Sequence, residues 1–448
     1  MILTMSNIMR SINRSPKAFV AYAYVTRLSG LMKRGMRRTE SLRSKEQNNS
    51  DIPSLEKALN GLKKGSFKVY GEYLIHNNLD DYKRKTLMVS HELSLTGAPI
   101  VLFRMAEVMI EHGWFALLVS PCDGKLGLHA ARHGIPTMVI PNLFESDYIL
   151  ECRRAFNVVV VNTILPYKVI RNLCNTDTRV LWWIHEAGIS YTRLYAREMP
   201  RRVTENIHVC CVGSYTKREL KKRFHLYKAD TLTYYSPDLS GSYNDDQHGT
   251  QFIRTGKYDL AKKRTYGLIG TIGASKGQDI MVRSIELLSN RTRQGSRFVF
   301  VGATKEKDIK NQICDLENRF SDTVFLLNEL DMDDVHNVYR EIDFLICASR
   351  QDPLPVVVAE ALSLSKPVIC SDGAGSSEII KHYDAGFVYK RNDMRRLSEL
   401  IELTYQLSEN EYSRLAVNAR KAYEAVFSKN VFKKNLSNVM ENYKSWKE

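Results

Sequence analysis

The sequence predicts an α/β protein with two doubly wound, Rossmann-like parallel sheets in tandem, preceded by a basic N-terminal extension. Two series of short apolar runs alternate with longer mixed segments, and a polar, turn-rich stretch separates the two series. Regular alternation of this kind indicates parallel strands covered by helices. The length of 448 residues is too great for one hydrophobic core, which also favours two or three domains.

The first 50 residues differ in composition from the rest. Ten lysines and arginines lie between residues 10 and 45, whereas the only acidic residues of this segment are Glu40 and Glu46. Aromatic and aliphatic residues lie between the basic ones. Such a segment can lie on an anionic membrane surface, or it can be a flexible extension. Residues 48–53 are typical of a linker, and we assign the extension and linker to residues 1–65.

No apolar run reaches the roughly 20 residues of a membrane span. The eight cysteines include no Cys-x-x-Cys pair and lie mostly in or beside apolar stretches, as reduced core thiols do. We therefore expect a cytoplasmic protein, and the membrane interpretation of residues 1–50 would place it peripherally on the inner face of the cell membrane.

The net charge of +15 calls for an anionic partner: a nucleic acid, a phosphorylated substrate or an anionic membrane. Much of the basic excess lies in the first 50 residues, and no nucleic-acid-binding motif is present. We therefore expect no nucleic acid as a partner.

The first series of apolar runs predicts a domain over residues 66–235. Its expected strands are 87–90, 115–121, 137–141, 158–162, 180–184 and 209–213. Residues 236–262 are predicted to connect the domains, because glycine, asparagine and aspartate interrupt any periodicity there.

The second series predicts another domain over residues 263–427. Its expected strands are 266–271, 298–302, 324–327, 344–347, 368–370 and 386–389. Residues 428–448 place apolar side chains at helical spacing, and this final helix is expected to pack back on the first domain.

A glycine-rich turn opens the second domain. Gly270 lies at the end of an apolar strand, and Lys276-Gly277 enters the helix expected from about Lys276. Glycines at a strand end let a ligand approach the backbone, and helix amides beside a lysine favour an anion. A tight turn alone would explain the glycines, but together with the acids described next the segment predicts a phosphate site.

Two acids flank the start of a later helix. Asp352 follows the strand ending at Cys347 and is either a helix cap or a ligand-binding residue. The prolines around it leave the amides of Leu354 and Val356 free to meet a ligand. Glu360 lies among apolar residues and should be partnered, either by a nearby lysine or by a ligand hydroxyl.

The first domain offers weaker candidates. Gly97 and Ala98 would let the backbone approach a ligand, although an ordinary strand-to-helix turn would also explain them. His185 ends an apolar strand, and a structural histidine is about as well supported as a functional one.

These motifs resemble family-4 retaining glycosyltransferases, which have the two-Rossmann GT-B fold. Asp352 and Glu360 are similar to that family's Glu-seven residues-Glu signature, and residues 267–278 resemble its first donor-domain strand and Lys-Gly helix entry. Residues 90–107 and 183–188 resemble its glycine loop and its His-containing strand end. The resemblance covers residues 85–427.

The resemblance implies a role for each matched residue. Glu360 would hold the nucleotide ribose, Lys276 would neutralise the diphosphate, and His185 would face the donor sugar. Asp352 stands where the family usually has a glutamate near the transferred sugar, and Thr271 stands where it often has an arginine. Lys276 would then act with helix amides alone, or with another cation such as Arg350.

The implied activity is transfer of a sugar, with retention of anomeric configuration, from a nucleotide sugar to a glycan or glycolipid acceptor in surface polysaccharide synthesis. We expect no cofactor and no metal, because protein cations can stabilise the diphosphate. The alternatives are another GT-B enzyme, such as a nucleotide-sugar epimerase or an inverting transferase, and a non-catalytic nucleotide- or glycan-binding homologue.

Overall fold

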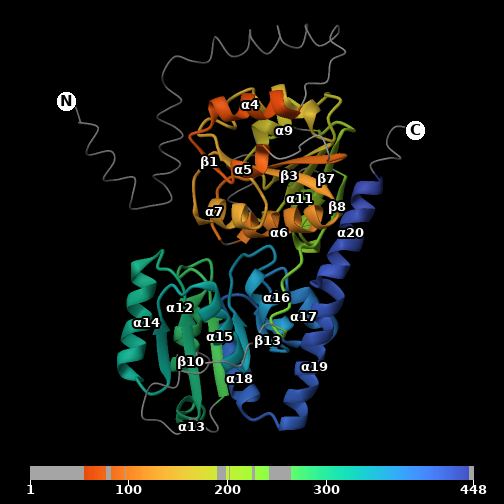
Figure 1. Ribbon diagram of the computed structural model, residues 1–448. Helices are drawn as coiled ribbons and strands as arrows, with labels where there is room; N and C mark the ends of the chain where they lie inside the picture. The colour runs from red at the N-terminus through yellow and green to blue at the C-terminus, as the bar shows by residue number, and fades with distance from the viewer. Residues whose placement is uncertain are drawn as a thin grey trace, which may run out of the picture. The chain divides into compact units, whose positions relative to one another are not determined.

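The computed structural model of the chain describes residues 55–76, 82–95, 97–188, 198–200, 202–223, 228–241 and 264–442 (Figure 1). The predicted basic extension of residues 1–50 and most of the predicted connection between the domains lie outside these residues. By its internal contacts, Pro53–Glu448 forms one compact unit.

The first sheet has eight strands in the order β1-β4-β3-β2-β5-β6-β7-β8, and only the β1–β4 pair is antiparallel. Its strands are β1 (Lys68–Tyr70), β2 (Arg84–Val89), β3 (Trp114–Ser120), β4 (Thr137–Val139), β5 (Val158–Asn162), β6 (Val180–Ile184), β7 (Ile207–Cys211) and β8 (Ala229–Thr231). The six strands predicted from apolar runs all form. The two edge strands β1 and β8 escaped prediction because neither is an apolar run, and neither contains a fully buried residue.

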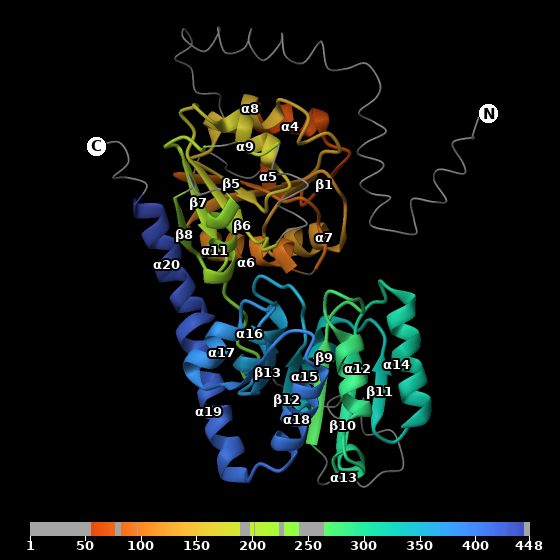
Figure 2. The ribbon, with the colours of Figure 1, turned by 180° about the vertical axis from the view of Figure 1, so that it is seen from behind.

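Helices cover both faces of this sheet (Figures 1 and 2). They are α4 (Leu55–Gly65), α5 (Tyr73–His76), α6 (Gly97–Glu111), α7 (Lys125–Arg132), α8 (Tyr148–Cys152), α9 (Tyr167–Leu173) and α11 (Ser214–Arg223). Helices α6 and α7 pack on one face, and α4, α8 and α9 pack on the other. The extension predicted to reach residue 65 therefore ends with a packed helix, since Leu59 and Leu62 of α4 are buried.

The second sheet has six strands, all parallel, in the order β11-β10-β9-β12-β13-β14. They are β9 (Arg264–Ile269), β10 (Ser296–Val301), β11 (Val324–Leu327), β12 (Phe344–Cys347), β13 (Val368–Ser371) and β14 (Gly386–Tyr389), as the sequence predicted. The helices around it are α12 (Gln278–Glu286), α13 (Asn290–Gln294), α14 (Lys307–Arg319), α15 (Met332–Glu341), α16 (Val356–Ser363), α17 (Ser377–Tyr383), α18 (Met394–Tyr405) and α19 (Glu409–Val426).

Both sheets reverse their strand order at one point. Strands β9 and β12 are neighbours in the second sheet, and β2 and β5 are neighbours in the first, although two other strands separate the members of each pair along the chain. In doubly wound sheets, ligands bind beyond the carboxyl ends of strands at such a switch point. The loops that follow these four strands are therefore the expected ligand-binding region of the fold.

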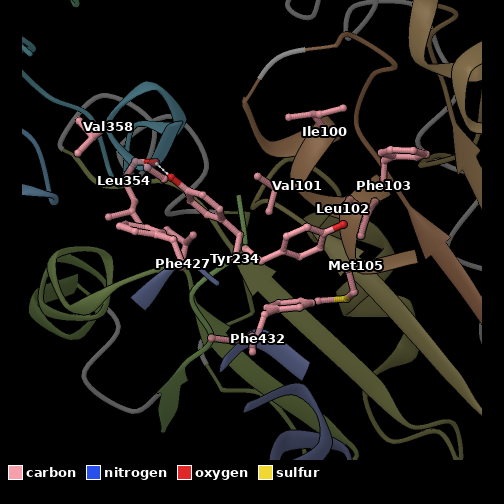
Figure 3. Close-up of a cluster of buried hydrophobic side chains, with 14 of the residues drawn as sticks. Ile100, Val101, Leu102, Phe103, Met105, Tyr234, Leu354, Val358, Phe427 and Phe432 are labelled. Atoms are coloured by element: carbon pink, nitrogen blue, oxygen red, sulfur yellow. Dashed lines mark hydrogen bonds between the residues drawn. The ribbon is translucent and has the colours of Figure 1, made fainter. Parts of the chain in front are cut away.

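The final helix, α20 (Lys429–Asn442), packs against residues of the first sheet. The ring of Phe432 stacks on Trp183 of β6 with the ring centroids 6.2 Å apart, and it also contacts Tyr235. Figure 3 shows Phe432 and Tyr234 in one buried cluster with side chains of α6 and with Leu354. This apolar cluster contains residues of both sheets.

Candidate functional site

The loop after β9 is held in shape by glycines and one buried glutamine. Gly270 has φ 143°, and Gly277, which precedes α12, has φ 77°. A Cβ atom on Gly277 would lie 2.1 Å from the carbonyl oxygen of Ala348, so only glycine allows this approach to the end of β12. The Gln278 side-chain amide donates to the carbonyl oxygens of Gly270 and Thr271 at 3.3 and 3.1 Å.

Lys276 and Asp352 meet beyond the two neighbouring strands. The ammonium nitrogen of Lys276 donates to Asp352 Oδ2 at 2.5 Å. Asp352, more than any other group, raises the pKa of Lys276 above its ordinary value of 10.5. Lys276 is therefore charged throughout the neutral range, and the stability that comes with its raised pKa is lost as the pH rises through that pKa in strongly alkaline solution.

The interpretation of Asp352 as a helix cap is wrong. Helix α16 begins after Pro355, which makes no side-chain capping bond. Asp352 is instead fixed through its backbone, since its amide donates to Gly373 at 3.0 Å and its carbonyl accepts from Gly375 at 2.9 Å. Its carboxylate is thus left to Lys276.

Arg350, the other cation considered for a diphosphate, already has a partner. Its guanidinium donates twice to Asp279 in the first turn of α12, at 2.8 and 2.6 Å, and also to the carbonyl of Ala274. A bidentate pair of this kind is strong and geometrically fixed. Lys276 is therefore the better candidate to meet an anion at this edge.

The start of α16 presents backbone donors. Within the described part of the chain, the amides of Leu354 and Val356 donate no hydrogen bond. The Leu354 carbonyl accepts from the hydroxyl of Tyr234 at 3.2 Å, as Figure 3 shows, which ties this turn to the segment after β8. These amides can stabilise negative charge without reorganisation.

Glu360 is partnered, as its apolar surroundings require. Its side chain is 14% exposed, Oε1 lies 3.6 Å from Nη2 of Arg104, and Oε2 accepts from the Tyr339 hydroxyl at 2.9 Å. The nearby lysine considered as a partner does not fill this role, because the ammonium of Lys366 donates to the Arg340 carbonyl. Arg104 belongs to α6, so Glu360 is contacted from both sheets' helices.

The end of β6 gathers titratable groups. Burial, with a further contribution from His91, lowers the pKa of His185 to about 3, and its Nε2 is buried and meets no hydrogen-bond partner in the described part of the chain. Burial raises the pKa of Glu186 to about 7, although its carboxylate accepts from the amides of Ile164 and His185, both at 3.1 Å. His185 is thus a neutral imidazole at physiological pH.

Sequence reasoning missed Glu186, His91 and Arg104. A signal for the first two exists, because a His-Glu pair follows both β2 and β6 closely. For Arg104 the signal is a single arginine inside an otherwise apolar stretch of α6, which must find a partner.

Gly97 and Ala98 lie at the switch point of the first sheet. Gly97 opens α6 with φ 56°, and a Cβ atom there would meet none of the described residues within 4 Å. Asn162, which ends β5, donates to the Ala98 carbonyl at 2.9 Å. The turn therefore borders open space, as a ligand-facing turn does.

Two further contacts join the groups from the two sheets. A Cβ atom on Gly188, three residues after His185, would lie 2.1 Å from the side chain of Gln351, which precedes Asp352. Glu378 accepts from Ser214 of α11 at 2.6 Å and pairs with Arg218. The segments that carry His185 and Asp352 are therefore in contact.

Comparison with known proteins agrees with this arrangement. A family model described as "Glycosyl transferases group 1" matches residues 254–422, and "Glycosyl-transferase family 4" matches residues 82–219. YtcC of Bacillus subtilis (strain 168), a candidate glycosyltransferase by name, is 22% identical over 334 residues, which are 71% of this chain and 81% of YtcC. Spore coat protein SA of the same organism is 22% identical over 58% of this chain and 71% of its own length.

Solved structures share the fold. The Anabaena protein Alr3699/HepE, crystallised with UDP and glucose, gives a TM-score of 0.65 at 16% identity and covers 80% of this chain and 100% of its own. WaaG, a glycosyltransferase involved in lipopolysaccharide biosynthesis, gives 0.60 at 13% identity over 79% of this chain and 99% of its own. With two family models that together match more than half of its residues, the chain belongs to glycosyltransferase family 4 and has the GT-B fold.

Proposed function

We propose that this protein is a retaining glycosyltransferase that transfers a sugar from a nucleotide-sugar donor to a hydroxyl acceptor. The observation that carries the proposal is the meeting of Lys276 and Asp352 beyond neighbouring strands β9 and β12, with Glu360 on the helix that follows. In support, HepE, which shares the fold, has been crystallised with UDP and with UDP-glucose.

Each part of the donor has a partner in this proposal. Lys276 and the amides of Leu354 and Val356 meet the diphosphate, and Glu360 accepts hydrogen bonds from ribose hydroxyls. Gly270 gives the diphosphate access to the backbone. Asp352 lies beside the transferred sugar and exchanges its hydrogen bond to Lys276 for one to a sugar hydroxyl.

In this proposal, residues beyond the strand ends of the first sheet also contact the donor. Gly97 and Ala98 allow close approach to the donor, and His185 faces the donor sugar. Because His185 is neutral, it acts through hydrogen bonding, and it neither supplies nor requires a positive charge. An imidazole of this kind can accept from a sugar hydroxyl through its unpartnered Nε2.

The reaction breaks the bond between the sugar and the diphosphate and forms a bond from the sugar to the acceptor oxygen on the same face. The acceptor proton moves to a departing phosphate oxygen. Because the acceptor attacks on the same face from which the diphosphate leaves, no covalent enzyme intermediate is needed. Lys276 and the α16 amides stabilise the charge that develops on the diphosphate, and they do so without a cofactor or metal. Excluding water protects the donor from hydrolysis.

The acceptor we propose is a glycan or glycolipid of a surface polysaccharide. The resemblance to family members and the name of WaaG, which shares the fold, support this class. Among the described residues, no helix has the length and apolar character to cross a membrane. Residues 1–50 would instead bring the protein to an anionic membrane by charge, and deleting them should then release it from anionic liposomes.

Turnover of nucleotide sugars tests the proposal. The full chain is incubated with a panel of UDP-, GDP- and ADP-sugars, with candidate glycan and lipid acceptors, and both nucleotide release and the anomeric configuration of the product are measured. One donor should be consumed in an acceptor-dependent way with retention. A panel without any turnover would refute the enzyme, and an inverted product would refute the retaining mechanism.

A non-catalytic homologue is the second candidate. The observations that favour it are Asp352 in place of the family's usual glutamate and Thr271 in place of its frequent arginine. This candidate predicts that a nucleoside diphosphate binds and that no donor is turned over. An epimerase would convert the donor sugar without any acceptor, so the same panel identifies it.

A further inference from the structure

Arg104 is a buried arginine on α6, an apolar helix that packs on the first sheet. Its charged partner, Glu360, lies on α16, a helix of the second domain. The side chain of Arg104 is 5% exposed, and Nη2 lies 3.6 Å from Oε1 of Glu360 on α16. Residues around it on α6 are almost all apolar and buried. Bulk water therefore does not solvate the charge of Arg104, and its polar atoms need partners in the protein or in a ligand.

The described residues satisfy the guanidinium of Arg104 only in part. Its Nη1 is buried and meets no hydrogen-bond partner among the described residues. The separation of 3.6 Å between Nη2 and Glu360 also exceeds the roughly 2.7–2.9 Å of a charge-assisted hydrogen bond. Buried donors are rarely left unpaired, so the buried Nη1 is suited to donate to a ligand atom.

The carboxylate of Glu360 offers the complementary acceptor. Oε2 accepts from Tyr339 at 2.9 Å, whereas Oε1 faces Arg104 beyond hydrogen-bonding distance. Burial also lowers the pKa of neighbouring His336, which is therefore neutral and brings no second cation. One carboxylate oxygen and one amino group are thus left opposite each other.

A hydroxyl group fits between them. It can donate its proton to Oε1 of Glu360 while its oxygen accepts from Arg104, and a neighbouring hydroxyl can accept from Nη1. A phosphate fits less well, because the Glu360 carboxylate would repel it. A vicinal diol on a neutral ring meets both requirements.

We propose that Arg104 completes the ribose site of Glu360 from the opposite sheet and binds the vicinal hydroxyls of the donor nucleotide. This inference rests on the proposed function, since it takes Glu360 as the ribose ligand. Arg104 is then a donor-binding residue from the first sheet. The ribose would be held by both sheets at once, so donor binding would strengthen the contact between α6 and α16.

Discrimination between ribose and deoxyribose tests this role directly. The full chain is titrated calorimetrically with UDP, GDP and ADP to find the diphosphate that binds, and then with the 2′-deoxy and 3′-deoxy forms of that nucleotide. A site built around a hydroxyl rejects the analogue that lacks it, so the wild type should prefer the ribonucleotide about tenfold or more. Arg104→Gln should reduce that preference at least about threefold for one of the two deoxy forms.

Arg218→Gln is the matched control, because Arg218 also pairs with a glutamate of the second sheet, Glu378, and is 52% exposed. It should leave the preference unchanged. Arg104→Lys keeps the charge, so it tests the same prediction if the glutamine variant does not fold, and it should also lower the preference because lysine lacks the planar fork.

The outcomes separate this inference from the proposed function. An unchanged preference in both Arg104 variants, with a lowered thermal midpoint, would show a purely structural ion pair and overturn the inference alone. Wild-type protein that binds a nucleoside diphosphate without preferring ribose would overturn the ribose role of Glu360 and Arg104 together. Failure to bind any of the three diphosphates would overturn the proposed function and this inference with it.

Discussion

Lys276 and Asp352 are hydrogen-bonded at 2.5 Å, although they follow different strands of the second sheet. The cation proposed to meet the donor diphosphate is therefore already neutralised by the carboxylate proposed to meet the sugar. Diphosphate binding must compete with Asp352 for the same ammonium group. This competition makes the roles of the two residues separable by experiment.

Asp352→Asn should bind a nucleoside diphosphate more tightly than the wild type. Removing the carboxylate frees the charge of Lys276, and the gain should be roughly threefold to tenfold, as expected for a partly exposed ion pair. Calorimetric titration at neutral pH measures it. Asp352→Glu, which keeps the charge, should show no such gain, and equal affinities for the two variants would contradict the competition.

Lys276→Ala and Glu360→Gln should each lose about 2–4 kcal/mol of transition-state stabilisation, because each removes a group aimed at the donor. This loss corresponds to a fall in kcat/KM of roughly thirtyfold to a thousandfold. Initial rates with the donor found in the panel give the values. Lys305→Ala is the control on the exposed surface near the same sheet edge, and near-normal rates in both test variants would rule out the proposed roles.

Apolar patterning predicted the six parallel strands of the second sheet and the inner six of the first, since buried parallel strands are short continuous apolar runs. It could not predict β1 or β8, whose three residues pair at sheet edges by backbone contacts. Strand order was equally hidden, because pairing between β9 and β12 depends on tertiary packing.

The residues of the candidate site were predictable from the sequence, but their pairings were not. The sequence predicted Lys276, Asp352 and Glu360, because their chemistry is local to strand ends and helix starts. It could not predict that Asp352 would pair with Lys276, since the prolines made a capping role look equally reasonable. Arg104 stands out as a lone arginine in an apolar stretch, but its partner could not be predicted, because Glu360 lies in the other half of the chain.

Glu186 should make stability fall as the pH rises through the neutral range. Its ordinary pKa is 4.5 and its value in the folded protein is about 7, so between these values the folded state holds a proton that the unfolded state has lost. The contribution is complete below pH 4.5 and disappears as the pH passes 7. Glu186→Gln, which cannot ionise, should lack this dependence.

Urea unfolding at pH 5, 6, 7 and 8 measures the effect. Relative to the wild type, Glu186→Gln should gain about 1–2 kcal/mol between pH 5 and pH 8, a range reduced for partial exposure of the side chain. Glu205→Gln on the exposed surface should show no such trend. A difference between wild type and Glu186→Gln that stays constant with pH would show that Glu186 titrates normally.

Phe432→Ala should destabilise the protein by about 3–4 kcal/mol, because Phe432 is 1% exposed and stacks on Trp183. The loss measures how far α20 contributes to the core of the first sheet. Urea unfolding at neutral pH gives the value. Val417→Ala on α19, where the side chain is 54% exposed, is the control and should cost little; an equal cost in both would mean that α20 packs only loosely.

Thr271→Arg should strengthen binding of a nucleoside diphosphate. Thr271 is exposed directly after Gly270, and Arg350 cannot supply a second cation there because Asp279 binds it on both amino groups. An arginine at residue 271 would add a charge beside Lys276, with an expected gain of roughly threefold to tenfold in affinity at low salt.

Thr271→Gln separates charge from added side-chain length and should show no gain. The advantage of the arginine should shrink at 1 M salt, where screening acts within about 3 Å. Affinities equal to the wild type at low salt would mean that the diphosphate does not approach Gly270. Lys276 would then bind the donor from the Asp352 side alone, and the proposed path of the diphosphate along the glycine turn would have to be abandoned.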